Sequence, residues 1–373
     1  MRSALYVVLT VIVVGVGAVV LRSTLLGSGE VDASAELVLL REEVSPLLVY
    51  SEFGQWADTV WAADPDDPGH RAYVASIEHR SGFGISASLS PDGTTLAYIV
   101  LPRGASRSDS AELWRLEIGT TNPRKLAEDV DLLTDPVWTP ASDAVVIRRP
   151  TGIETSNLVL VDLDGNESTL TQGIAAPFPI GFAPDGQSLY VATLSAAGTE
   201  LVRVPRGGGT AAALTQLSTG FSRDWSVSPD GSKLAYLAQT SGSSLSYTAE
   251  VYDVDGDETR GAVAGLSGSQ FNPVWHPDGG LTVGSAPATE AAGAMVHALS
   301  DGAGGTAGVL AGPDIGFDVP LSWSTDGSYL VVRNFEGASA SNPGPSHVVI
   351  ISNTGQRLQL SAQSDVLVIG WLH

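Results

Sequence analysis

The 373-residue sequence contains no cysteine. This absence excludes disulfide bonds, and it excludes a lipid anchor attached through a cysteine. Cysteine usage therefore gives no information on the redox compartment. Lysine is nearly missing too, since Lys125 and Lys233 are its two occurrences.

Positive charge of any kind is scarce. The chain has 19 Lys and Arg residues against 41 Asp and Glu residues, for a formal net charge of −22. Such a protein repels nucleic acid and anionic lipid surfaces on average, so we expect no nucleic-acid partner. We interpret the excess as a solvated acidic surface that keeps an exported domain soluble. A surface for cations or for a basic partner is the alternative.

Motifs of common catalytic sites are also lacking. No glycine-rich phosphate loop opens a helix, and no Gly-x-Ser-x-Gly nucleophile elbow occurs. The six histidines show no metal-ligand spacing. Residues 162–167 and 253–258 look like calcium loops, but their glycine stands fourth rather than sixth, so we interpret them as hairpin turns. We therefore assign no catalytic residue, no metal ligand and no cofactor.

What the sequence does contain is a repeat built on a Ser-Pro-Asp-Gly turn between two strands. In residues 225–238, WSVSPDGSKLAYLA, proline and glycine favour the reversal, and the following apolar residues alternate as in a half-buried strand. Six related units begin 49, 44, 45, 48 and 48 residues apart. A period of about 47 residues is typical of a propeller or a repeat array. The anchor residues of the six turns are Pro91, Pro140, Pro184, Pro229, Pro277 and Thr325.

Each unit contains four predicted strands. A large apolar residue lies two positions before each anchor, and we expect it to pack one unit against the next. After the anchor, two further strand-like runs form a hairpin around a glycine turn, so that one unit corresponds to one propeller blade. The large apolar residues are Leu89, Trp138, Phe182, Val227, Trp275 and Trp323, and Trp371 continues the series.

The Pro-Asp-Gly turn after an aromatic resembles the TolB-type repeat of the WD-repeat-like propellers. The resemblance covers roughly residues 47–373, although the unit at Pro140 has lost the motif and the unit at Thr325 has replaced its proline. The chain is also similar to the propeller half of prolyl-oligopeptidase-like peptidases, without their hydrolase domain. The resemblance implies the fold and says little about function.

The predicted fold is an all-β, seven-bladed propeller. Six units have their own inner strand, and the seventh joins three strands within residues 46–77 to the last strand, 366–373. This pairing of the two ends would close the ring and remove its exposed sheet edges. Six blades, the more common number that the TolB resemblance implies, is the alternative.

One apolar segment precedes the propeller. After a head of residues 1–3, residues 4–21 form eighteen residues without a charge, which at ~1.5 Å per residue span roughly 27 Å, enough for a hydrocarbon core. We predict a retained signal anchor, followed by an acidic tether over 22–46 and the propeller over 47–373. A cleaved signal peptide, giving a secreted or periplasmic protein, is the alternative. Residues 35–44 within the tether fit a short helix or an outer strand.

Candidate binding residues lie in the loops that lead into the inner strands. Five of these loops contain a phenylalanine, and polar residues flank some of them. One interpretation is packing of a repeated aromatic between blades; the other is an aromatic rim that binds a peptide or another apolar ligand at one mouth of the central channel. The candidates are Phe83, Phe178, Phe221, Arg223, Asp224, Phe271, Asn272, Phe317 and Asp318.

Together these features predict a membrane-anchored, extracytoplasmic propeller that binds or scaffolds without catalysis. The TolB resemblance implies an envelope protein or a peptide as the partner, and we expect a monomer. The alternative is a hydrolase or lyase with its site in the central funnel, for which Asp135, Asp224 and Asp318 lie at suitable positions.

Overall fold

The computed structural model describes residues 33–106, 109–152, 155–172, 174–240, 246–262, 269–286, 293–300, 303–305 and 312–373. The predicted head 1–3, the apolar segment 4–21 and the first part of the tether lie outside the described residues. Within the described ranges, no helix has both the length and the apolar character that crossing a membrane requires.

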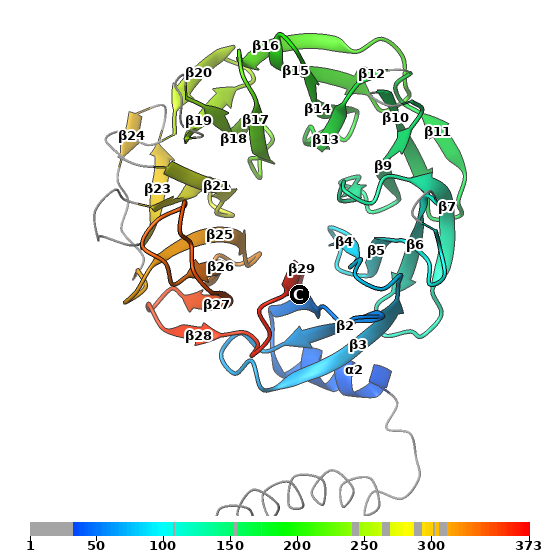
Figure 1. Ribbon diagram of the computed structural model, residues 1–373, viewed down its shortest axis with the longest axis vertical. Coiled ribbons are helices and arrows are strands. Elements are labelled where there is room, and N and C mark those ends of the chain that lie inside the picture. Colours follow the sequence, from blue (N-terminus) through cyan, green and yellow to red (C-terminus); the bar gives the residue numbers. More distant parts are fainter. Residues whose placement is uncertain are drawn as a thin grey trace, which may run out of the picture.

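The strands of the described residues form seven sheets arranged around a central axis (Figure 1). Six sheets are built from consecutive strands, and the seventh combines strands from both ends of the described chain. The chain is therefore an all-β propeller, as predicted. In Figure 1, first strands such as β4, β13 and β17 lie nearest the axis.

The sheets of consecutive strands follow the repeat. The first contains β4 (Ser86–Leu89), β5 (Thr95–Val100), β6 (Ala111–Glu117) and β7 (Arg124–Val130). The second contains β8 (Val137–Trp138), β9 (Ala144–Pro150), β10 (Thr155–Asp162) and β11 (Glu167–Thr169), with β12 (Ile174–Ala175) paired to β10. The third contains β13 (Pro177–Phe182), β14 (Ser188–Ser195), β15 (Gly198–Pro205) and β16 (Ala212–Ser218).

The remaining three follow the same order. The fourth sheet contains β17 (Ser222–Val227), β18 (Lys233–Gln239), β19 (Tyr247–Asp253) and β20 (Glu258–Gly261). The fifth contains β21 (Ser269–Trp275), β22 (Gly280–Ala286), β23 (Gly293–Ser300) and β24 (Ala303–Gly305). The sixth contains β25 (Phe317–Trp323), β26 (Tyr329–Phe335), β27 (Ser346–Ser352) and β28 (Arg357–Gln359).

The composite sheet closes the ring. Its strands are β29 (Val366–Leu372), β1 (Leu47–Glu52), β2 (Ala57–Ala63) and β3 (Arg71–Glu78), in that order. β29 pairs antiparallel with β1, and Leu48 lies opposite Trp371. The predicted pairing of the last strand with the first strand of the propeller is confirmed.

The repeated turn is held by its own serine and aspartate. Ser228 donates a hydrogen bond from Oγ to Asp230 Oδ1 at 2.6 Å, and the main-chain N–H of Lys233 donates to Ser228 Oγ at 2.9 Å. Gly231 takes φ 64°, a value that glycine adopts at little cost. The turns at Asp92 and Asp326 contain the same serine–aspartate bond at 2.6 Å.

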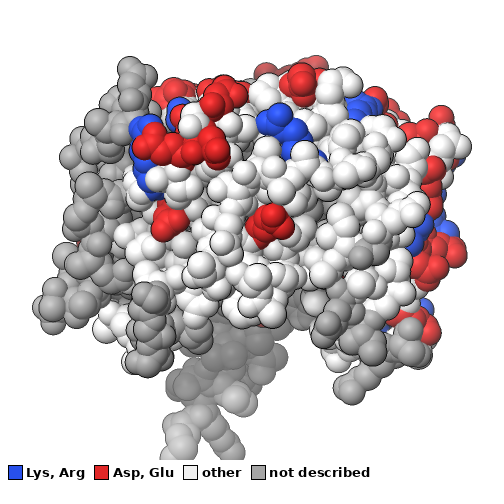
Figure 2. Space-filling model, turned by 90° about the horizontal axis from the view of Figure 1, so that it is seen from above, with Lys and Arg blue, Asp and Glu red and all other residues white. Residues whose placement is uncertain are grey.

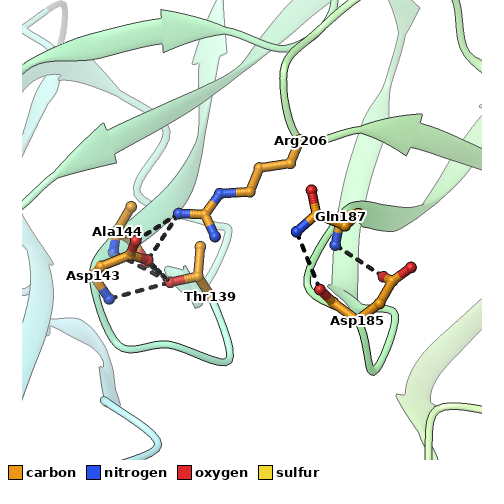
Figure 3. A network of polar contacts seen from close by, with 6 residues as sticks. All are labelled: Thr139, Asp143, Ala144, Asp185, Gln187 and Arg206. Carbon is orange, nitrogen blue, oxygen red and sulfur yellow. Dashed lines mark hydrogen bonds and ion pairs between the residues drawn. The ribbon is translucent and has the colours of Figure 1, made fainter.

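The turn at Pro140, which lacks the Pro-Asp-Gly motif, still reverses the chain, but different side chains stabilise it (Figure 3). Ser142 takes the positive φ, at 59°, that glycine takes in the related turns. The aspartate is displaced by two residues, and Thr139 donates from Oγ1 to Asp143 Oδ1 at 2.6 Å. Arg206 of the next sheet then binds both oxygens of Asp143, at 2.9 and 2.7 Å. The loss of the motif thus leaves the turn intact and adds a contact between sheets.

Tryptophans two positions before the turn anchors join neighbouring sheets, as predicted. Trp275 Nε1 donates to the main-chain oxygen of Ser226 at 2.9 Å, and Trp138 Nε1 donates to that of Ser88 at 3.2 Å. Both rings are nearly buried. Each sheet buries its apolar residues mainly against its neighbours, because the core is divided into clusters between adjacent sheets.

The helix α2 (Ala33–Glu43) covers the composite sheet from outside. Leu37 and Leu40 join the cluster between this sheet and the β4–β7 sheet. Arg41 donates to the main-chain oxygen of His373 at 2.9 Å. Of the two structures left open for residues 35–44, the helix is the one present.

Candidate functional site

The two ends of the ring differ in the connections that they carry. Because neighbouring strands are antiparallel, loops that lead into first strands share one end with connections between second and third strands. We call this end the loop face; Phe83 and Phe221 lie on it. The opposite end, which we call the turn face, carries the repeated turns, such as those of Asp92 and Asp230.

Exposed apolar side chains gather on the loop face. In the described residues, seven large apolar side chains are at least 36% exposed, and five of them lie in loops of this face. The other two, Val38 and Leu39, belong to α2. Isolated exposed apolar residues are common, but a concentration at one end of a domain is a feature of interaction sites. The five, which we call the apolar rim, are Trp56 (50%), Phe83 (36%), Leu133 (87%), Phe221 (58%) and Ile315 (68%).

The turn face is acidic instead. The aspartates of the repeated turns accept hydrogen bonds from nearby serine hydroxyls and main-chain N–H groups. For Asp230, the bond from Ser228 outweighs a smaller effect of burial and lowers the pKa of the carboxyl. Figure 2 shows Asp and Glu side chains gathered along the upper edge of the ring in that view. These carboxylates have a structural role in the turns.

The predicted phenylalanines divide into exposed and packed residues. Phe83 and Phe221 belong to the apolar rim. Phe317 is 3% exposed, and its ring stacks on Phe271 and Phe335 with centroids 5.3 and 5.2 Å away. The packing interpretation therefore applies to Phe271 and Phe317, which join neighbouring sheets.

Phe178 is half-buried between two other side chains. Its ring lies 5.6 Å from that of Trp225, and the guanidinium of Arg148 lies 4.4 Å from its centroid. Phe178 thus links three sheets, since Arg148, Phe178 and Trp225 belong to β9, β13 and β17.

The polar candidates beside these aromatics have different surroundings. Arg223 is exposed and lies over the ring of Tyr247 at 4.3 Å. Asp224, with φ 53°, is half-buried, and burial raises the pKa of its carboxyl against the opposing effect of Arg223. Asn272, with φ 32°, donates from Nδ2 to the main-chain oxygen of Pro320 at 2.5 Å.

Asp318 is fully buried. Both of its oxygens accept hydrogen bonds from Arg357, at 2.9 Å, and Oδ1 also accepts one from Asn334 at 2.9 Å. These contacts make Asp318 part of the internal structure of its sheet, rather than of an accessible surface.

Inner strands contain bulges near the predicted polar positions. The register of β17 against β18 shifts between Arg223 and Ser226, and that of β21 against β22 shifts between Phe271 and Val274. Bulges re-aim side chains and are frequent beside functional sites. The left-handed backbone of Asp224 and Asn272 coincides with these two bulges.

A hollow of about 470 Å³ opens beside the last strand, on the loop face. Its apolar walls include Phe53, Ile85 and Leu367, and the half-buried Arg333 and the exposed Asp365 contribute charged groups. A second hollow, of about 280 Å³, lies between β25 and β29 and shares Arg333 with the first.

Below the larger hollow lies a buried pair, Asp58 and His79. His79 Nε2 is 3.0 Å from Asp58 Oδ1, and Nδ1 is 2.8 Å from the main-chain oxygen of Arg80. Asp58 also accepts hydrogen bonds from the N–H groups of Gly54 and Ile85, at 3.1 and 3.0 Å. The pair therefore joins two loops of the loop face, and both carboxylate oxygens of Asp58 have hydrogen-bond partners.

The sequence did not single out Trp56, Leu133, Ile315 or Arg333. Leu133 and Ile315 lie in loops that lead into inner strands, so the signal was a large apolar residue of any kind rather than phenylalanine. Among the described residues, no group of three or more His, Asp or Glu side chains is arranged to hold a metal ion.

Comparison with known proteins gives the fold. TolB from Acinetobacter baumannii is similar at a TM-score of 0.53 and 16% identity, over 91% of this chain and 71% of that one. The propeller domain of the trilobed protease from Pyrococcus furiosus matches at 0.56 and 14%, over 85% and 94% of the two chains. A putative TolB from Agrobacterium tumefaciens matches at 0.51 and 14%, over 86% and 100%.

The chain has the TolB-like propeller fold. No protein-family model matches its sequence, and a search of curated proteins finds no match. At these identities the likeness concerns the fold and leaves the function of this TolB-like propeller to be argued from its own residues.

Proposed function

We propose that this TolB-like propeller is a membrane-tethered, extracytoplasmic binding module that takes a protein or peptide of the cell envelope on its loop face. The apolar rim is the observation that carries this proposal. Five large apolar side chains are exposed at one end of the ring, and each can bury apolar surface against a partner. Such burial contributes a gross stabilisation of about 25 cal/mol per Å² of apolar area removed from water.

Cationic neighbours of the aromatic rim residues support the same proposal. The guanidinium of Arg103 lies 5.7 Å from the ring of Trp56, and that of Arg80 lies 5.1 Å from the ring of Phe83. Aromatic and arginine side chains dominate the binding energy of protein interfaces. A partner segment with apolar and acidic residues would complement this surface.

The tether is proposed from the sequence and from the contacts of α2. The apolar segment 4–21 has the length of a membrane span. Packing of Leu37 and Leu40 against the propeller fixes the point where the chain leaves the ring. We propose that the propeller lies on the extracytoplasmic side of this span.

Site-specific photo-cross-linking tests the binding face. A benzophenone amino acid replaces Leu133 or Phe221 in the full chain, and Asp185 on the turn face serves as the control position. We expect cross-linked products in intact host cells from the two rim positions and none from the control. Products from Asp185 alone would overturn the assignment of the face.

Fractionation tests the tether separately. The full chain should remain with membranes after alkaline carbonate extraction, whereas residues 33–373 expressed with a cleavable export signal should be released. Release of both forms would contradict membrane anchoring without affecting the rim.

A second candidate function, a hydrolase or lyase of the funnel, is favoured by Asp224. Its left-handed φ and the raised pKa of its half-buried carboxyl are features of residues that exchange protons. A hydrolase and lyase substrate screen of the purified protein tests this alternative, because activity that Asp224→Asn abolishes would replace the binding proposal.

A further inference from the structure

The larger hollow of the loop face has apolar walls and one arginine with unused hydrogen-bonding capacity. Arg333, on β26, is half-buried and lines both hollows beside β29. It donates from Nη1 to the main-chain oxygen of Ser364 at 3.1 Å and from Nη2 to that of Val366 at 2.8 Å. A guanidinium has five N–H donors, so three remain.

The charge of Arg333 is not neutralised by a bound carboxylate. Among the described residues, none forms an ion pair with it, although Asp365 lines the same hollow. Arg148 occupies the same position of the repeat, eight residues after its turn anchor, and it is paired with Asp131 through Nε at 2.5 Å. The two arginines therefore differ in the partner that each has for its charge.

The two carboxylates that line the hollow leave this guanidinium without a direct ion pair. Asp58 is buried and engaged by His79, Gly54 and Ile85. Asp365 is exposed at the rim of the hollow. Burial lowers the pKa of Arg333 against a raising effect of Asp365, which agrees with a guanidinium whose charge is only partly compensated.

We propose that this hollow binds the C-terminal carboxylate of an apolar peptide segment, with Arg333 as the residue that contacts the carboxylate. A planar guanidinium with free N–H groups matches a carboxylate in charge and geometry. Phe53, Ile85 and Leu367 would surround the side chain of the last residue. The volume of about 470 Å³ lies in the range of ligand sites, about 300–1,000 Å³.

This inference rests on the proposed function, because it names the part of a peptide partner that the loop face would recognise. Phe83, an apolar-rim residue, stands two residues before Ile85 of the hollow. A partner chain lying across the rim is thus able to end in the hollow.

Paired probes with the wild-type protein test the proposal. Acetyl-leucyl-phenylalanine with a free carboxylate and the same compound as its amide are titrated against residues 1–373 in detergent and followed by ligand-observed NMR. We expect the acid to bind at least about tenfold more tightly than the amide, the effect of hydrogen bonds to a charged group. Equal binding of the two compounds, or no binding of either, would overturn the proposal.

Three variants locate the interaction. Arg333→Gln should remove the preference for the acid, whereas Arg260→Gln, an equal change of charge at an exposed site of another sheet, should leave it unchanged. Arg333 also holds the loop before β29, so folding of its variant is checked by thermal melting. Asp365→Asn avoids that difficulty, and it should strengthen binding of the acid severalfold without affecting the amide. An unchanged affinity for the acid in Asp365→Asn would contradict a carboxylate site beside Arg333.

The two proposals fail separately. If no cross-links form at the apolar rim but the acid still binds more tightly than the amide, the proposed binding face would be contradicted and the carboxylate site would be supported. If the rim forms the same cross-links with partners that have free and amidated C-termini, the proposal of a carboxylate site would be contradicted, whereas the proposed binding face would not.

Discussion

Trp371 donates a hydrogen bond from Nε1 to Ser322 Oγ at 3.1 Å, across the boundary between the last sheet of consecutive strands and the composite sheet. The two residues are 49 positions apart, the same separation as between Trp275 and Ser226. Ring closure therefore uses the same type of indole N–H hydrogen bond that joins sheets elsewhere in the ring, with a serine hydroxyl as the acceptor in place of a main-chain oxygen. Closure is a further repetition of the unit rather than a special device.

Removing the ring of Trp371 should destabilise the whole propeller. The side chain is 6% exposed and packs between two sheets, so Trp371→Ala should lower the free energy of unfolding by about 3–5 kcal/mol. Trp371→Phe, which removes the N–H and keeps most of the apolar contact, should cost about 1 kcal/mol through the lost hydrogen bond. Urea unfolding measures both.

The matched control is Trp56→Ala. This ring is 50% exposed on the loop face, so its loss should change the unfolding free energy by less than about 0.5 kcal/mol. Equal losses for Trp56 and Trp371 would contradict closure through the last strand.

Glu52 makes the closure sensitive to acid. Its carboxylate accepts hydrogen bonds from Ser361 Oγ at 2.6 Å, Arg71 Nη1 at 2.7 Å and Trp61 Nε1 at 3.1 Å. Burial raises the pKa of Glu52, but these bonds together with the charge of Arg71 outweigh it, and the pKa is lowered. A lowered pKa contributes stability that is present above the unfolded-state value of about 4.3 and is lost as the pH falls through the native value.

Glu52→Gln should therefore lower the urea midpoint at pH 7, and the difference from wild type should shrink at about pH 3. Glu78→Gln is the control, because Glu78 and its partner Arg103 are both exposed and such pairs contribute little. A deficit of Glu52→Gln that is the same at both pH values would show that its ionisation does not matter.

Asp224 should show the opposite dependence on pH. Burial raises the pKa of its carboxyl, so the ionised form costs stability above the native pKa, and this cost disappears as the pH falls. Asp224→Asn removes the charge while asparagine tolerates the left-handed backbone. The melting temperature of the variant should exceed that of wild type at pH 7 and match it near pH 3.

Asp314→Asn provides the comparison for Asp224, since Asp314 is exposed on the same face. It should leave the melting temperature unchanged at both pH values. A lower melting temperature of Asp224→Asn at pH 7 would mean that the ionised carboxyl stabilises the native state.

The sequence predicted the features that depend on local signals. Turn residues and alternating strands identify the unit, and the large apolar residue two positions before each anchor predicted the contact between sheets. The terminal pairing followed from counting strands, because an unpaired β29 would leave two sheet edges exposed. These signals repeat along the chain and need no knowledge of distant neighbours.

The exposure of each loop residue depends on distant neighbours, and it was not predictable in this way. Phe221 and Phe317 occupy related positions where the chain enters an inner strand, yet one is 58% exposed and the other 3%, because Phe271 and Phe335 cover Phe317. The unpaired charge of Arg333 likewise depends on which oxygens the next sheet presents. The candidate site is therefore known from the sequence only as a set of loops.

This contrast gives the decisive comparison for the apolar rim. Phe317→Ala should lower the free energy of unfolding by about 3–5 kcal/mol, because it leaves a cavity between Phe271 and Phe335. Phe221 is more than half exposed, so Phe221→Ala should leave the free energy of unfolding within about 0.5 kcal/mol of wild type. It should nevertheless reduce the yield of photo-cross-links from Leu133, because a bound partner would lose an aromatic contact on the same face. If Phe221→Ala reduced stability as much as Phe317→Ala and left cross-linking unchanged, Phe221 would be a packing residue. The apolar rim would then lose the aromatic residue with the largest exposed fraction.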